Sequence, residues 1–266
     1  SDGQVLTSTG SGVGWEDATG GSSGPLFKTF GDSSFLVGND TTGTINGADY
    51  NTGVGVLALN GITTGDSNTA IGRATLYVLT TGSSNTAVGM NAGANVTGSS
   101  NTAVGESALS SASGSSASHN TAVGKEALKV NTTGTANAAF GNLSLDANTT
   151  GSYNTSIGYG TLTANTTGAD NTAVGINSLA ANTTAANNTA VGSSALEGTT
   201  AERNVAIGHN ALLDATTTHN NVCIGYEAGG SLTVFGANHN IAIGTEALAT
   251  LTDRADNIAI GYRAIG

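Results

Sequence analysis

The sequence predicts an all-β fold: a repetitive parallel β-roll, or β-solenoid, of about 14 coils that associates with further copies of itself. Two observations predict the coils. A motif close to Asn-Thr-Ala-Val-Gly recurs along most of the chain, usually every 17 residues, and its fifth residue is glycine in all 14 copies. A short fixed period indicates one small unit stacked many times. A third observation, the small apolar content of each coil, predicts the association.

The spacing of the copies indicates where the strands and turns lie. We number the motif positions 1 to 5, from its first residue to its glycine. Most steps are 17 residues, two are 16 and two are 19. A surface turn tolerates such variation and a strand register does not, so we expect the longer steps to bulge in turns near 110–118 and 230–238. Position 1 is Ser34, Asn51, Asn68, Asn85, Asn101, Asn120, Asn137, Asn154, Asn171, Asn188, Asn204, Asn221, Asn240 and Asn257.

The glycine at position 5 predicts a backbone requirement that every coil shares. That requirement is a positive φ, or a close approach that a Cβ would block. Position 4 is Val or Ile in 13 copies, with Phe140 as the exception, which predicts a short strand that runs into a turn. These structural glycines are Gly38, Gly55, Gly72, Gly89, Gly105, Gly124, Gly141, Gly158, Gly175, Gly192, Gly208, Gly225, Gly244 and Gly261.

An apolar Ala-Leu pair follows the glycine in many copies, as in Ala108-Leu109 and Ala195-Leu196. Polar turn residues come next, often Thr-Thr-Gly. The Ala-Leu segments are too short for a helix, and no period near 3.6 is sustained. Each unit is therefore predicted to contain a strand, a glycine turn, a second short strand and a Thr/Gly turn.

Composition excludes several classes of protein. With 40 Gly, 1 Pro, 5% aromatic and 9% charged residues, the chain is unlike an ordinary globular domain. Its regularly placed Val, Ile and Leu are unlike a disordered chain. A net charge of −11 and the lack of a basic run argue against a nucleic-acid partner. No stretch approaches 18 apolar residues, so no membrane insertion is expected.

Self-association is predicted from the thin coil. Fourteen coils stacked at about 4.8 Å make a rod of about 65 Å, and each coil offers few apolar side chains to a core. Alternation along a strand places positions 2 and 4 on one face and position 3 on the other. One face is expected to line the coil interior and the other a neighbouring chain, and alternation does not decide which. Position 2 becomes apolar in the last copies, which predicts a more deeply apolar and tighter C-terminal end: Val205, Val222, Ile241 and Ile258.

The motif Asn-x-Ala-Val/Ile-Gly-x-x-Ala-Leu resembles the head repeats of YadA-type trimeric autotransporter adhesins. With Asn-Thr-Thr-Gly between copies, at 131–134, 148–151 and 165–168, it looks still more like the repeat shafts of bacteriophage tail fibres. The opening segment 3–15 is also similar to a segment of phage fibre and appendage proteins. The resemblance implies a homotrimeric fibre of left-handed parallel β-rolls, either intertwined or side by side. The adhesin heads have a period shorter than 17.

No catalytic, cofactor or metal site is predicted. Glu106 and Glu126 occupy adjacent turns, but a solvated turn is favoured over a glycosidase pair. No Ser-His-Asp arrangement, Cys-His arrangement or phosphate-binding loop is present. Exposed tyrosines in the turn after the glycine could contact a surface or stack on sugars, or could cover the next coil: Tyr159, Tyr226 and Tyr262.

Three further features have simpler interpretations. Cys223 replaces the usual Ala at position 3 and is expected to be a buried small residue. The histidines are expected to be polar turn residues, although copies in a trimer could meet on the axis and bind a metal: His119, His209, His219 and His239. Glycosylation sequons arise from composition and are expected to be idle: Asn131, Asn148, Asn165 and Asn182.

The predicted function is structural, and the chain is not expected to be an enzyme. Residues 34–266 would form the shaft of a phage tail fibre or similar virion appendage, and residues 1–33 an N-terminal connector or cap. Trp15, Phe27 and Phe30 are expected to pack there, and Pro25 marks a break within the segment. The expected partners are two further copies, other virion or appendage proteins at the ends, and a host surface glycan or protein receptor.

Three other functions are weighed against the fibre shaft. A cell-surface trimeric adhesin or extracellular appendage would have the same roll. An ice-binding solenoid would use the threonines at position 2, which are interrupted at Ala138 and end after Thr189. A tailspike hydrolase is disfavoured by the low aromatic content and the lack of a catalytic cluster.

Overall fold

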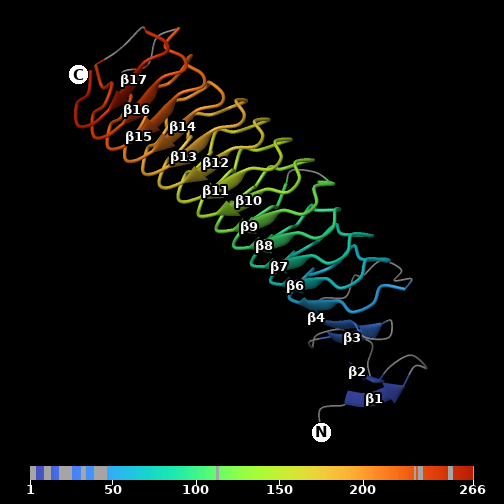
Figure 1. Cartoon of the computed structure of the whole chain (residues 1–266). Helices are drawn as coiled ribbons and strands as arrows, with labels where there is room; N and C mark the ends of the chain where they lie inside the picture. The colour runs from blue at the N-terminus through green and yellow to red at the C-terminus, as the bar shows by residue number, and fades with distance from the viewer. Residues whose placement is uncertain are drawn as a thin grey trace.

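The chain forms an elongated rod of stacked coils, with its two termini at opposite ends (Figure 1). The computed structural model describes the strands at 4–8, 13–17, 26–30 and 34–38, and residues 47–111, 114–230, 232, 236–250 and 254–265. The side chains of the first three strands lie outside this description, and so do Pro25 and the expected packing of Trp15, Phe27 and Phe30. Within the described part the fold is all-β and contains no helix.

Two sheets account for the described strands. β1 (Gln4–Ser8) and β2 (Val13–Asp17) form an antiparallel pair, and β3 to β17 form one sheet of 15 strands in sequence order. β3 (Leu26–Phe30) is antiparallel to β4 (Ser34–Gly38), so the sheet begins within residues 1–33. From β4 onward every pairing is parallel, with one strand in each coil: β5 (Thr52–Val54), β6 (Thr69–Ile71), β7 (Thr86–Val88), β8 (Thr102–Val104), β9 (Thr121–Val123), β10 (Ala138–Phe140), β11 (Thr155–Ile157), β12 (Thr172–Val174), β13 (Thr189–Val191), β14 (Val205–Ile207), β15 (Val222–Ile224), β16 (Ile241–Ile243) and β17 (Ile258–Ile260).

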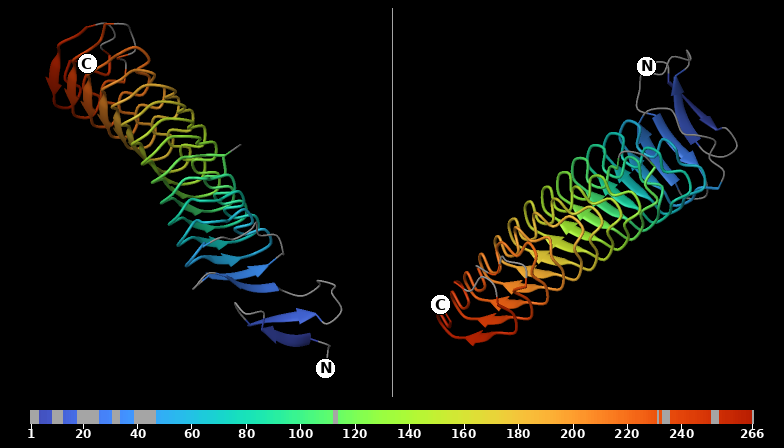
Figure 2. Two further views of the ribbon diagram at one scale, coloured as in Figure 1. Left: turned by 90° about the vertical axis from the view of Figure 1, so that its right-hand side faces the viewer. Right: turned by 90° about the horizontal axis from the view of Figure 1, so that it is seen from above.

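The strand register is the same throughout the roll. Position 2 pairs with position 2 across the 17-residue steps, as in Thr155↔Thr172. It also does so across the 16-residue step from β7 to β8 and the 19-residue step from β8 to β9. The prediction that turns absorb the irregular steps is confirmed. Figure 2 shows the strands along one side of the rod and the returning turns on the other.

Position 3 lines the interior of each coil. Ala173 is fully buried, and so is Leu179, the leucine of the following Ala-Leu segment. Both belong to a continuous core of alanine and leucine that runs the length of the roll. The interior is narrow because the side chain that points inward from each strand is small.

Position 1 forms an asparagine ladder from Asn51 to Asn257, and all of its members except the last are buried. Asn68 is fully buried, and its Oδ1 accepts hydrogen bonds from the backbone N–H of Asn85 at 2.9 Å and from Asn85 Nδ2 at 3.0 Å. Its own Nδ2 donates to Asn51 Oδ1 and to the carbonyl of Gly82, both at 3.0 Å. The asparagine side chain thus provides hydrogen-bond partners for a backbone N–H and a backbone carbonyl at the bend before the strand, which would otherwise be unpaired.

A shorter second ladder occupies the middle of the rod. Asn148, Asn165 and Asn182 each donate through Nδ2 to the Oδ1 of the preceding member, at 2.9 Å, beginning from Asn131. All four side chains are fully buried, and Asn182 Oδ1 at the end of the ladder has no hydrogen-bond partner. Other coils carry Ile62, Leu79 or Val96 in the corresponding place, so the core is more polar here than near β5 to β7.

The glycines at position 5 combine a positive φ with a close backbone approach. Their φ values lie between +124° and +138° from Gly55 to Gly261. A Cβ at any of them from Gly55 to Gly244 would lie 2.3–2.8 Å from the carbonyl oxygen of the next coil's glycine. A Cβ at Gly261, in the last coil, would meet nothing within 4 Å. Both features exclude a side chain at this position in the stacked coils.

The predicted second strand after the glycine is wrong. In the coil that begins at Asn171, φ is +55° at Asn177 and +52° at Leu179, and the segment is a turn. Repeated positive φ values are incompatible with a strand. The backbone amides still bond to neighbouring coils, Asn177 N–H to Tyr159 O and Leu179 N–H to Ala195 O, both at 3.1 Å. Residues before the motif asparagine, such as Asp170, also have positive φ.

Candidate functional site

One surface feature runs the length of the roll: the outer face of the sheet, which we define as the side chains at positions 2 and 4 of β5 to β17. Position 3 points inward, so these two positions point outward and are half-buried or exposed in every strand. Ala173 is fully buried, for example, whereas Ile157 is 43% exposed. None of the 26 residues of the outer face is charged. It is therefore an uncharged strip, rich in Thr, Val and Ile, along the whole roll.

The Val and Ile residues at position 2 of β14 to β17 belong to this outer face. We expected them to make the C-terminal coils more deeply apolar, but they do not enlarge the core. Val205 and Val222 are half-buried and Ile258 is 66% exposed, whereas the neighbouring Cys223 at position 3 is fully buried. The alternation of a strand sends positions 2 and 3 to opposite faces, so the change from Thr to Val or Ile alters only the outer surface.

Charged residues near the strands lie in the turns, and two lysines among them form ion pairs with glutamates. Lys125 Nζ lies 3.2 Å from the Glu106 carboxylate, and Lys129 Nζ lies 3.2 Å from Glu126. Glu106 and Glu126, the two carboxylates considered for catalysis, thus each have a lysine partner. Such exposed pairs contribute little to stability. This geometry resembles a solvated turn more than a pair of catalytic carboxylates.

The three candidate contact tyrosines lie in the turn after the glycine and are 46–68% exposed. They do not form one cluster, because Tyr159 lies four coils from Tyr226. The ring of Tyr226 lies 5.7 Å from that of His209, and its hydrogen bond to the Glu227 carboxylate raises the pKa of Tyr226. Tyr262 lies 5.1 Å from the Arg263 guanidinium, which places a cation over its ring.

The histidines occupy separate turns. His219 Nδ1 accepts a hydrogen bond from the Glu202 N–H at 3.1 Å, and His239 Nδ1 lies 3.8 Å from an Asp256 carboxylate oxygen. His209 Nδ1 lies 3.2 Å from the Ser193 carbonyl. Among the described residues, no group of three His, Cys, Asp or Glu side chains could hold a metal ion.

The sequon asparagines are inaccessible in the folded chain. These residues are the four members of the second ladder, and their Nδ2 atoms donate hydrogen bonds inside the roll. An oligosaccharide on any of them would have to occupy the core. Cys223 is also buried, and burial raises the pKa of its thiol to about 12, which makes it an unreactive thiol.

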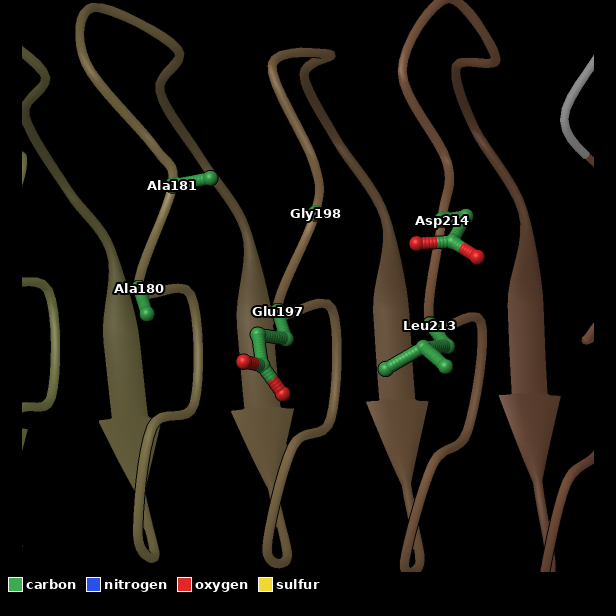
Figure 3. A pocket seen from close by; sticks show the side chains of 6 residues that line it. All are labelled: Ala180, Ala181, Glu197, Gly198, Leu213 and Asp214. Atoms are coloured by element: carbon green, nitrogen blue, oxygen red, sulfur yellow. The ribbon is translucent and has the colours of Figure 1, made fainter.

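An open groove of about 540 Å³ lies on the roll beside three successive coils. Figure 3 shows its lining: Ala180 and Ala181 from one coil, Glu197 and Gly198 from the next, and Leu213 and Asp214 from the third. The only ionisable groups among these six residues are the carboxylates of Glu197 and Asp214, and the groove is open to solvent. The outer face is therefore the stronger candidate for a functional surface.

Comparisons with protein-family models, curated proteins and solved structures find no match to this chain. Within the part of the chain that the structure describes, no helix has the length and apolar character needed to cross a membrane.

Proposed function

We propose that this chain is a rod-like structural shaft that assembles side by side into a homotrimeric fibre, in a phage tail fibre or a similar virion appendage. The observation that carries the proposal is the outer face, 26 uncharged side chains in register in a chain whose net charge is −11. The number three and the phage setting come from the sequence resemblance to tail-fibre shafts and adhesin heads. The shaft would space or present receptor-binding regions during host attachment.

The chemistry of the outer face suits identical copies. In a parallel symmetric assembly, the same residues of different copies meet near the axis. A charged side chain there would face the same charge on the other copies, which is unfavourable. The face has no such charge. Thirteen strands at about 4.8 Å, each about 10 Å long, give about 600 Å² per copy. A pair of these faces buries about 1,200 Å², near the lower limit for a stable interface.

Sedimentation with electron microscopy of the whole chain tests the proposal. We expect trimeric rods, and Val123→Lys on the outer face should dissociate them because it brings like charges together. Thr167→Lys, in an exposed turn, adds the same charge and should leave the mass unchanged. Circular dichroism checks that both variants keep the fold. A wild-type monomer, or a Val123→Lys trimer, would refute the proposed assembly.

The same rod could belong to a cell-surface adhesin or another extracellular appendage. The proposed assembly is common to both settings. Labelling the chain with an antibody separates them, because a phage fibre is detected on virions and an adhesin on the cell surface.

Ice binding is a second candidate that one observation favours. The threonines at position 2 lie in register on the outer face of β5 to β9 and of β11 to β13. A trimer that covers this face would hide them, so ice binding requires a monomer. Thermal hysteresis measured on a monomeric chain would support this function over the fibre.

A further inference from the structure

The outer face changes its chemistry between β13 and β14. Position 2 is threonine in eight of the nine strands from β5 to β13, and Val or Ile in all four strands that follow. Position 4 is Val, Ile or Phe throughout. The last four strands therefore present eight aliphatic side chains and no threonine hydroxyl. We call them the C-terminal aliphatic patch: Val205, Ile207, Val222, Ile224, Ile241, Ile243, Ile258 and Ile260.

The patch is continuous because the strands that carry it are paired in register. Val205 pairs with Val222, Val222 with Ile241, and Ile241 with Ile258. Position 4 forms a second column beside the first. Adjacent members of a column are separated by the strand spacing of about 4.8 Å. All eight residues are β-branched, and such side chains have few rotamers to lose when they are covered.

The change from Thr to Val or Ile alters what each coil gains from being covered. Threonine and valine have nearly the same shape, but covering a hydroxyl without a partner is unfavourable. Covering the extra methyl groups of Val or Ile is favourable. Each of the last four coils therefore favours association more strongly than a Thr-bearing coil of the same backbone.

We propose that copies of this chain associate first, and most tightly, through the C-terminal aliphatic patch, and that contact then extends toward β5. This inference rests on the proposed function, since it needs the outer face to be the interface between copies. A second copy is the occupant that suits the patch. Copies in register bring identical aliphatic side chains together. The columns of position 2 and position 4 have the same spacing in every copy, because the copies have the same sequence and fold.

The boundary between β13 and β14 also selects the axial register of the copies. Within β5 to β9 every strand presents Thr with Val or Ile, so a slip by one coil replaces each contact with an equivalent one. At the boundary, the same slip places a Val or Ile of one copy against a Thr of another. The patch thus provides a register that the uniform Thr-bearing strands lack.

A pair of matched quadruple variants tests the proposal. The first replaces the patch at position 2 with the threonine of the earlier coils: Val205→Thr, Val222→Thr, Ile241→Thr and Ile258→Thr. The second removes four aliphatic side chains from the other end of the same face: Val54→Thr, Ile71→Thr, Val88→Thr and Val104→Thr. Both changes lie outside the core, and circular dichroism checks that the coils form.

We measure the rate of association by light scattering after the chains are mixed under native conditions. The first variant should slow association by at least about tenfold and the second by less than about threefold, because only the first removes side chains from the contact that forms first. Equal changes in rate, or a larger change in the second variant, would overturn the inference and leave the proposed assembly standing. A wild-type chain that stays monomeric would overturn both.

Pulsed hydrogen exchange during assembly of the wild-type chain gives an independent readout. Amides at 205–260 should become protected before those at 52–104. Simultaneous protection, or the reverse order, contradicts assembly from the C-terminal aliphatic patch.

Discussion

The buried asparagine ladder can be tested by the substitution Asn68→Ala. The change removes all four hydrogen bonds of a fully buried side chain. It leaves three groups without a partner: the Gly82 carbonyl, the Asn85 N–H and one N–H of the Asn85 amide. Asn51 Oδ1 keeps its bond from the backbone N–H of residue 68, at 2.9 Å. Each buried unpaired group costs about 1–3 kcal/mol, so we expect the free energy of unfolding to fall by at least about 3 kcal/mol.

Urea unfolding at a fixed chain concentration measures this loss, because association and folding are coupled. The control is Thr64→Ala, which deletes an exposed polar group from the preceding coil and should change stability by less than about 0.5 kcal/mol. If both variants unfold at the same urea concentration, the ladder does not stabilise the roll as reasoned.

A second substitution separates hydrogen bonding from loss of volume. Asn68→Asp keeps the shape but replaces the Nδ2 donor with an acceptor that faces Asn51 Oδ1. Burial would raise the pKa of this carboxyl above its ordinary value of about 3.9. Its neutral form is then favoured in the folded state, so the variant should lose stability as the pH rises above about 4. A variant as stable as the wild type at pH 7 contradicts the assigned bonds.

Three more predictions concern the backbone and the thiol. Gly175→Ala should destabilise the roll far more than Gly261→Ala. Both glycines have φ near +130°, but only at Gly175 would a Cβ meet a carbonyl oxygen, at 2.5 Å. Equal melting temperatures of the two variants would refute the steric argument. Ala136→Gly should stabilise by about 1 kcal/mol because φ there is +55°, whereas Ala164→Gly should destabilise by a similar amount, as thermal unfolding can show. Cys223 should be inert to thiol reagents until the chain unfolds. Because burial raises the pKa of this thiol to about 12, the free energy of unfolding should fall as the pH rises from about 9 toward 12. The substitution Cys223→Ala should remove this contribution to the pH dependence.

Local sequence rules were sufficient for much of the architecture. The 17-residue period, the strand at positions 2 to 4 and the constant register through irregular turns follow from a repeated motif with a β-branched residue and a glycine. The second strand was mispredicted because Ala-Leu is also compatible with a strand, and nothing local to Leu179 reveals its positive φ. That conformation persists because neighbouring coils bond the backbone on both sides.

The sequence by itself determined that the chain stacks as a roll and that positions 2 and 4 share a face. Only the tertiary structure decided which face is the interior, because Ala at position 3 and Thr or Val beside it are each compatible with either side of a strand. It also revealed the asparagine ladder, whose donor and acceptor lie 17 residues apart in Asn51 and Asn68 and meet only when the coils stack. The uncharged outer face became recognisable as an interface candidate for the same reason, since a surface exists only after the interior has been assigned.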